Sequence, residues 1–203
     1  MGTAELINSI PAGHELKLSD LAFGGEGEVA LSFATKAWRP EVPADFVLKA
    51  EGVTEVSISE LITERKGKPV SGAIETLTIA EDHPLLLDYG PRASIFGQSP
   101  LPDPYRFFLE FHKLVRDQFA IPREPLRYLN YKGRMAEWLG IVYSRSYGLL
   151  TAPEPVATAA TALLDPQVAL YHVLPEPALG TPGAYKVLQL GSQWIIAKEF
   201  KIV

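Results

Sequence analysis

The sequence predicts an α+β protein, with an antiparallel β-rich region at residues 1–100 followed by an α+β region at residues 101–203. Two observations predict this class. Short runs in which apolar and polar residues alternate fill the first region, and glycine or proline separates them. Residues 104–118 instead repeat apolar side chains at helical spacing. The Pro-rich residues 97–104 mark the boundary between the regions, or form a surface loop within one continuous domain.

The first region is predicted to consist of strands because apolar and polar side chains alternate along it. Alternation places one set of side chains on each face of a strand, and an antiparallel sheet with one solvated face gives this pattern. The cluster Gly24-Gly25-Glu26-Gly27 lies between two such runs and predicts a hairpin turn. The predicted strands cover residues 15–18, 28–33, 46–50, 53–59, 61–65 and 73–80.

Residues 104–118 give the clearest predicted element, an amphipathic helix. Asp103 suits the N-cap position and Pro104 the first helical position. Apolar side chains then recur along one stripe, while charged residues occupy the opposite side. The helix is expected to end before Ile121-Pro122. The stripe comprises Phe107, Phe108, Phe111, Leu114, Val115 and Phe119.

The end of the chain is predicted to be a small α+β half with a mixed sheet. An alanine-rich stretch at residues 153–164 predicts a helix, and strand-like runs precede and follow it. A strand–helix–strand order in so short a segment suggests the mixed sheet. Residues 123–147 show no clear pattern. The predicted strands cover residues 147–150, 168–173, 185–190 and 194–200.

The composition is that of a soluble globular chain and excludes several functions. The 203 residues include 19 Lys or Arg and 24 Asp or Glu, a net charge of −5, and no cysteine. Such a chain cannot form disulfides, thiolate zinc sites or iron–sulfur clusters, and it has no cysteine nucleophile. The N-terminus lacks a signal-peptide pattern, and no apolar run approaches the ~18 residues of a membrane span. We therefore expect a soluble, cytoplasmic protein without a membrane partner.

Charge is distributed unevenly along the chain. Residues 1–100 hold 8 basic and 15 acidic residues, whereas residues 101–203 hold 11 and 9. Residues 105–147 alone hold 8 basic and 4 acidic residues, together with 10 of the 20 aromatic residues. A basic, aromatic segment can bind nucleic acid, because bases stack on aromatic rings while Lys and Arg neutralise phosphates. The net acidity of the chain and the one-sided phenylalanines of the helix disfavour that interpretation.

No local motif predicts a reaction or a cofactor. The sequence contains no phosphate-binding loop, no G-x-G-x-x-G fingerprint and no G-x-S-x-G nucleophile elbow. The four histidines, His14, His83, His112 and His172, do not have the spacing of a zinc site. We therefore predict no cofactor and no metal, and we favour a protein that is not an enzyme.

A candidate pocket or interface lies on one flank of the predicted helix and in the segment that follows it. Tyr105, His112 and Arg116 project within ~40° of one another beside the apolar stripe, given ~100° of rotation per residue. An arginine at such a border can bind a carboxylate or phosphate through two hydrogen bonds. Tyr, Trp and Arg commonly anchor interfaces, which adds four residues of the following segment. These are Tyr128, Tyr131, Arg134 and Trp138.

A second set of residues gives an alternative based on acid–base or metal chemistry. Asp82 and His83 place a carboxylate beside an imidazole, and Asp88 and Arg92 follow within ten residues. Such a group can bind a divalent cation or transfer protons. A solvated turn before Pro84 explains the same residues without any chemistry.

The sequence favours a non-catalytic binding protein whose partner is another protein, which it neutralises or escorts. The missing catalytic motifs and the basic, aromatic segment of an otherwise acidic chain support this hypothesis. The first alternative is a hydrolase or transferase that acts on a small anionic substrate. In that enzyme His83 or His112 is the base, and Arg92 or Arg116 holds the anion. The second alternative is nucleic-acid binding through residues 105–147.

Overall fold

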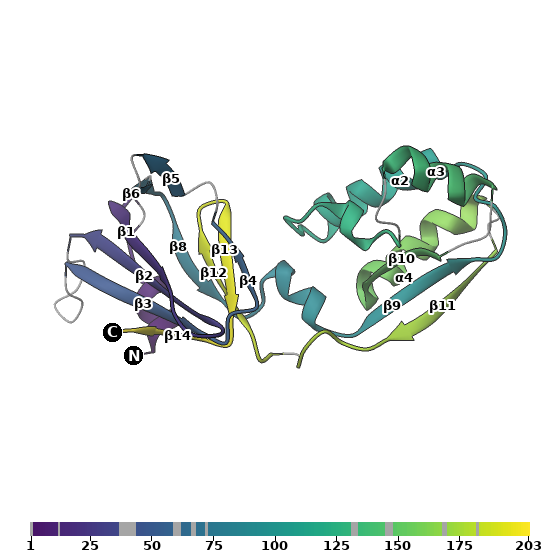
Figure 1. Cartoon of the computed structure of the whole chain (residues 1–203). Coiled ribbons are helices and arrows are strands. Elements are labelled where there is room, and N and C mark those ends of the chain that lie inside the picture. The colour runs from purple at the N-terminus through teal and green to yellow at the C-terminus, as the bar shows by residue number, and fades with distance from the viewer. Residues whose placement is uncertain are drawn as a thin grey trace. The chain divides into compact units, whose positions relative to one another are not determined.

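Contacts divide the protein into two compact units in a computed structural model of the chain (Figure 1). Unit 1 is Met1–His83 with Gly183–Val203, and unit 2 is Pro84–Pro182. Helices and antiparallel sheets both occur, so the predicted α+β class is confirmed. The structure describes residues 2–11, 13–36, 44–58, 62–65, 68–71, 73–130, 134–144, 148–167, 170–181 and 183–203.

The described residues of unit 1 form two antiparallel sheets, a separate hairpin and a short helix. Its elements are α1 (Thr3–Asn8), β1 (Leu16–Phe23), β2 (Glu28–Thr35), β3 (Asp45–Glu51), β4 (Glu55–Ser57), β5 (Ile62–Arg65), β6 (Lys68–Ser71), β7 (Ala73–Ile74), β8 (Leu77–Ala80), β12 (Lys186–Leu190), β13 (Gln193–Ala197) and β14 (Glu199–Ile202). One sheet has the strand order β14-β3-β2-β1-β7 and the other the order β4-β13-β12-β8. The hairpin pairs β5 with β6.

One hydrophobic core joins the two sheets of unit 1. Side chains alternate between the two faces of a strand, so every second residue of β2 enters this core, namely Val29, Leu31 and Phe33. The other sheet contributes Leu188 and Ile195 to the same cluster. The alternation seen in the sequence is therefore the pattern of one buried and one more exposed face.

The predicted hairpin turn joins β1 to β2. The backbone N–H of Gly24 donates to the carbonyl of Glu28 at 3.1 Å, and the N–H of Glu28 donates to Gly25 at 3.0 Å. Gly27 has a φ of +77°, a left-handed conformation that glycine adopts without steric cost. The glycine cluster thus serves as a turn, as the sequence predicted.

Unit 2 is inserted between two strands of unit 1 that are hydrogen-bonded neighbours. β8 and β12 pair antiparallel, with Ala80 opposite Val187 and Leu77 opposite Leu190. The chain leaves unit 1 after β8 and returns to it at β12. This division differs from the predicted one at residue 100, because the Pro-rich residues 97–104 lie inside unit 2.

In the part of unit 2 that the structure describes, one three-stranded sheet has helices on one face. Its elements are η1 (Pro84–Tyr89), β9 (Arg92–Gly97), α2 (Pro104–Lys113), η2 (Leu114–Gln118), η3 (Pro125–Tyr128), α3 (Met135–Ser144), β10 (Gly148–Pro153), α4 (Glu154–Leu164), η4 (Asp165–Gln167) and β11 (Tyr171–Glu176). The strand order is β10-β9-β11. Ala93 and Ile95 of β9 join the core that α2, α3 and α4 complete (Figure 1). Arg92, Ser94 and Phe96 therefore belong to the opposite, outer face of the sheet.

The helix predicted at residues 104–118 is confirmed as α2 followed by η2. The Asp103 carboxylate accepts the backbone N–H of Arg106 at 2.9 Å, which is the expected N-cap bond. The last turn, η2, is a π-helix, and the N–H of Phe119 donates to Leu114 at 3.2 Å. Ala120, with a φ of 51°, ends the helix in the left-handed conformation. Such a residue commonly terminates helices, although glycine is the usual choice.

The sheet in residues 101–203 requires a correction. We expected a mixed sheet, but every strand pair among the described residues is antiparallel. The reason is that β10 and β11 both pair with β9, a strand that the sequence did not predict, whereas β12, β13 and β14 belong to unit 1. The segment 123–147, left undecided, contains η3 and α3.

Candidate functional site

The predicted residues on the helix flank lie on α2 and η2. Tyr105 is 60% exposed, Arg116 is exposed and His112 is half-buried. The His112 ring meets the ring of Phe108 edge-on, with 6.3 Å between the ring centroids. His112 is thus held partly by contact with the apolar stripe, while Tyr105 and Arg116 extend from the surface of unit 2.

The candidates from the following segment have different surroundings. Tyr128 and Trp138 are both 2% exposed and belong to the core of unit 2. The indole of Trp138 stacks on Phe107, with 6.4 Å between ring centroids. Neither ring is open to a base or a partner from outside. Arg134 is exposed, and Tyr131 lies outside the residues that the structure describes.

The alternative acid–base set is divided between the units. Asp82 and His83 belong to unit 1, and Asp88 and Arg92 to unit 2. Asp88 is buried and pairs with the Nη1 atom of Arg123, which is buried as well. In the part of the chain that the structure describes, no group of three or more histidines and carboxylates could hold a metal ion.

The Asp88–Arg123 ion pair holds together two segments of unit 2. The Nη1 atom of Arg123 also donates to the carbonyl of Leu85 at 3.5 Å, so the guanidinium contacts η1 twice. Removing one partner of such a pair leaves a buried charge without compensation, which is strongly destabilising. Arg123 was missed because sequence spacing does not show which carboxylate a distant arginine will meet.

A network of polar side chains crosses the outer face of the unit 2 sheet. Ser94, which is 1% exposed, lies at the centre of this network on β9. Its Oγ donates to Glu176 Oε1 at 2.6 Å and lies 2.6 Å from Thr151 Oγ1. The hydroxyl of Thr151 donates to the side-chain oxygen Oδ1 of Asn130 at 2.8 Å. The network therefore links β9, β10, β11 and Asn130, two residues after the end of η3.

The two edge strands of the unit 2 sheet differ in hydrogen bonding and in exposure. At β10, Leu150 forms an isolated bridge with Leu129, and Asn130 N–H donates to the carbonyl of Leu149 at 3.3 Å. At the other edge, β11 is exposed along most of its length, including Val173 at 44% and Leu174 at 50%. These two side chains point to opposite faces of the sheet, so β11 exposes apolar surface on both faces.

Backbone hydrogen bonding shows which groups of β11 point outward. The N–H of Gln98 donates to the carbonyl of Leu170 at 2.6 Å, so Leu170 faces β9. In an antiparallel ladder every second residue faces the neighbouring strand, which places His172, Leu174 and Glu176 toward β9. Tyr171, Val173 and Pro175 therefore direct their backbone groups away from the sheet. The outward edge offers two N–H donors and three carbonyl acceptors, since proline has no N–H.

Side-chain contacts fix the start of β11. The hydroxyl of Tyr171 donates to Asp165 Oδ1 of η4 at 2.8 Å. Burial raises the pKa of Tyr171, and the hydrogen bond to Asp165 raises this pKa further. Gln98 contacts the Nε2 atom of His172 on the outer face. The edge is thus held in an extended conformation from both of its faces.

No protein-family model, no curated protein and no solved structure matches the chain. Among the residues that the structure describes, no helix is long and apolar enough to cross a membrane.

Proposed function

We propose that the protein is a non-catalytic binding protein that captures another protein by adding one strand of that partner to the outward edge of β11. The exposed, apolar edge of β11 is the observation that supports this proposal. A cysteine-free chain suits the reducing cytoplasm, where such a protein could neutralise or escort its partner.

Unpaired strand edges are sites of pairing with another chain. Natural sheets usually protect an edge with lysine, an inward charge, a bulge or a covering loop. β11 has no lysine and no bulge, and of the usual protecting features it contains Pro175 near its end. A partner strand would satisfy the outward backbone groups of Tyr171 and Val173, which is the chemistry of β-strand addition. Side chains on alternate positions of that strand would meet Val173 on one face and Leu174 on the other.

The partner is a different protein rather than a second copy of this chain. If two copies paired antiparallel about Val173, Tyr171 of one copy would lie opposite Pro175 of the other. Pro175 cannot donate to the Tyr171 carbonyl, so each copy would lose one hydrogen bond. If the copies paired about His172, the two histidine side chains would lie directly opposite on one face. A foreign strand without proline avoids both costs.

The charge and burial of unit 2 favour protein over nucleic acid as the partner. Unit 2 contains nine Lys or Arg and nine Asp or Glu, so it has no net positive charge. The aromatic rings that could have stacked on bases, Tyr128 and Trp138, are buried. Non-specific nucleic-acid binding depends on a surplus of positive charge.

Hydrogen exchange on the full chain tests the proposal with a strand-forming probe, acetyl-Lys-Val-Thr-Val-Thr-Val-Lys-amide. We expect the probe to slow exchange at the outward amides of Tyr171 and Val173. The amides of His172 and Leu174, which already face β9, should change little. A probe with the same sequence but N-methylated at every residue should not slow the outward amides, because neither of its edges then has N–H donors and the methyl groups crowd both edges.

Two variants provide the matched comparison. Leu174→Lys places a charge on the exposed edge and should weaken probe binding roughly tenfold, since an apolar contact is lost. Leu126→Lys changes a leucine of similar exposure elsewhere in unit 2 and should leave binding unchanged. The proposal is refuted if the probe leaves the amides of Tyr171 and Val173 unprotected. A change of oligomeric state with concentration, protecting the same amides without any probe, would instead assign the edge to self-association.

A further inference from the structure

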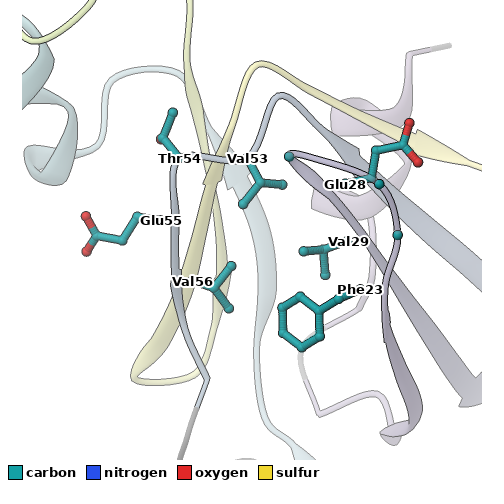
Figure 2. Close-up of a pocket in the computed structure, with 10 residues that line it drawn as sticks. Phe23, Glu28, Val29, Val53, Thr54, Glu55 and Val56 are labelled. Atoms are coloured by element: carbon teal, nitrogen blue, oxygen red, sulfur yellow. The ribbon is translucent and has the colours of Figure 1, made fainter.

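A small pocket opens in unit 1 beside the hairpin turn between β1 and β2 (Figure 2). Its volume is about 250 Å³, and ten residues line it. One wall comes from the turn itself, and the opposite wall comes from the segment that leads into β4, a strand at the edge of its sheet. Every lining residue belongs to unit 1.

The interior of the pocket is apolar and its sides carry negative charge. Figure 2 shows Phe23, Val29, Val53 and Val56 grouped between Glu28 and Glu55, whose carboxylates lie on opposite sides. Phe23 is 66% exposed, an unusual exposure for a phenylalanine at the end of a strand. The ten lining residues include these two glutamates and no lysine, arginine or histidine.

Neighbouring groups contact both glutamates. Glu55 Oε1 accepts the indole N–H of Trp194 at 3.0 Å, a neutral donor. Glu28 lies 3.5 Å from the ammonium group of Lys49, and both side chains of this pair are about two-fifths exposed. Exposed pairs of this kind are weak. Unit 1 as a whole contains 15 acidic and 10 basic residues, the entire net charge of the chain.

Backbone hydrogen bonds hold the two walls at a fixed separation. The N–H of Val53 donates to the carbonyl of Gly27 at 2.9 Å, which joins the hairpin turn to the opposite wall. Gly27 adopts a left-handed conformation that only glycine adopts readily. The pocket is therefore formed before any partner arrives, and no ordering of its backbone opposes binding.

We propose that this pocket binds one apolar side chain from a basic segment of a partner protein. A volume of about 250 Å³ admits one leucine, isoleucine or phenylalanine side chain. It lies below the ~300–1,000 Å³ of pockets that enclose small molecules or cofactors. Lysine or arginine on either side of the apolar residue would meet Glu28 and Glu55, and charge complementarity of this kind fixes orientation. This site is separate from the β11 edge, which belongs to unit 2.

The probe for this site is acetyl-Lys-Gly-Leu-Gly-Lys-amide, titrated into the isotopically labelled full chain and followed by NMR. We expect saturable shifts at the amides of Gly24, Gly25, Gly27 and residues 53–56. Replacing the leucine of the probe by serine should weaken binding at least about tenfold, because burial of the apolar side chain is lost. Replacing both lysines of the probe by glutamates should also weaken its binding, and the loss of affinity should be larger at low salt than at high salt.

Two isosteric substitutions separate the pocket from general effects on unit 1. Val56→Thr keeps the shape of the pocket wall but adds a hydroxyl, and it should weaken binding of the leucine probe severalfold. Val47→Thr makes the same change at a half-buried position of β3 outside the pocket, and it should have no effect. Glu28→Gln should reduce the preference for lysine over glutamate in the probe.

Three outcomes would overturn all or part of the inference. Binding of an apolar side chain in the pocket is refuted if the leucine and serine probes bind equally, or if neither probe shifts the amides of the turn in the wild-type chain. The preference for a basic segment is refuted if the lysine and glutamate probes bind equally. Because the readout is at unit 1 amides, its failure is distinct from failure of strand addition, which is measured at Tyr171 and Val173.

Discussion

The two units place their polar groups differently. In the described residues of unit 1, salt bridges lie at the surface, such as Lys201 with Glu51 at 2.8 Å, and the core is almost entirely apolar. Unit 2 instead buries a charge pair, Asp88 with Arg123, and a hydroxyl, Ser94. Exposed salt bridges contribute little to folding stability, whereas removal of one partner of a buried salt bridge is strongly destabilising. Unit 1 should therefore tolerate changes of polar residues that unit 2 cannot.

The largest change that tests this comparison is deletion of unit 2. A chain in which a short Gly/Ser linker joins His83 to Gly183 should fold, because Ala80 and Val187 are already opposite each other in adjacent strands. Insertions at such sites are usually tolerated because the flanking structure does not depend on them. The measurement is cooperative urea unfolding with slow amide exchange in β2, β3 and β13. A molten or aggregated product would show that the core of unit 1 needs unit 2.

The next effect is at the buried ion pair. Arg123→Ala should lower the free energy of unfolding of unit 2 by about 3–5 kcal/mol, because the Asp88 carboxylate is left buried and unpaired. Amide exchange should locate the loss to unit 2. Arg106→Ala removes an exposed arginine paired with Glu110 and should leave the free energy of unfolding nearly unchanged.

A double replacement sharpens the test of the ion pair. Asp88→Leu together with Arg123→Met removes both charges while keeping apolar volume, so it should recover most of the stability lost in the single variant. If the double variant is as unstable as Arg123→Ala, geometry rather than charge compensation explains the loss.

A smaller effect is expected at the outer-face network. Ser94→Ala removes the hydroxyl that connects Thr151 to Glu176 and should cost about 1–3 kcal/mol, since buried partners lose their hydrogen bonds. Ser19→Ala, at an exposed serine on β1 of unit 1, should change stability by less than about 0.5 kcal/mol. Chemical denaturation measures the free energy of unfolding of both variants. Equal losses in the two variants would contradict the proposed difference between the units.

The smallest effect is a pH dependence in unit 1. A hydrogen bond from Lys201, assisted by the charges of Lys201 and Lys49, lowers the pKa of Glu51 from the ordinary value of 4.5. A carboxylate with a lowered pKa in the folded state contributes stability above its unfolded pKa and loses it as the pH falls. The stability difference between wild type and Glu51→Gln should therefore shrink below about pH 4.5. A difference that stays constant between pH 7 and pH 3 would exclude this contribution.

Local patterns allowed much of the fold to be predicted from the sequence. Alternation identified β1, β2 and β3, and the phenylalanine stripe with Asp103 identified α2. Helix α1 was missed because six residues provide little periodicity, and so short a helix is marginal without tertiary contacts. Strand β9 was missed because its core face offers only Ala93 and Ile95, with a buried serine between them.

Features that depend on long-range pairing could not be predicted. The insertion of unit 2 is visible only once β8 is seen to pair with β12, which lies far along the chain. The partner of Asp88 could not be predicted for the same reason, and the tyrosine and tryptophan chosen as interface anchors proved to be core residues. The composition gives the number of aromatic residues, but it does not show which of them will be buried against helices.

The position of the insertion also orders events during synthesis. Unit 2 is one uninterrupted stretch, so all of it is synthesised before residues 183–203. Unit 1 cannot form its complete sheets without residues 183–203. β12 and β13 are the inner strands of one sheet, and β14 pairs with β3 in the other. Domains generally fold as units in the order of their synthesis. All residues of the inserted unit, including the β11 edge, are therefore present in the chain before the sequence of its host unit is complete.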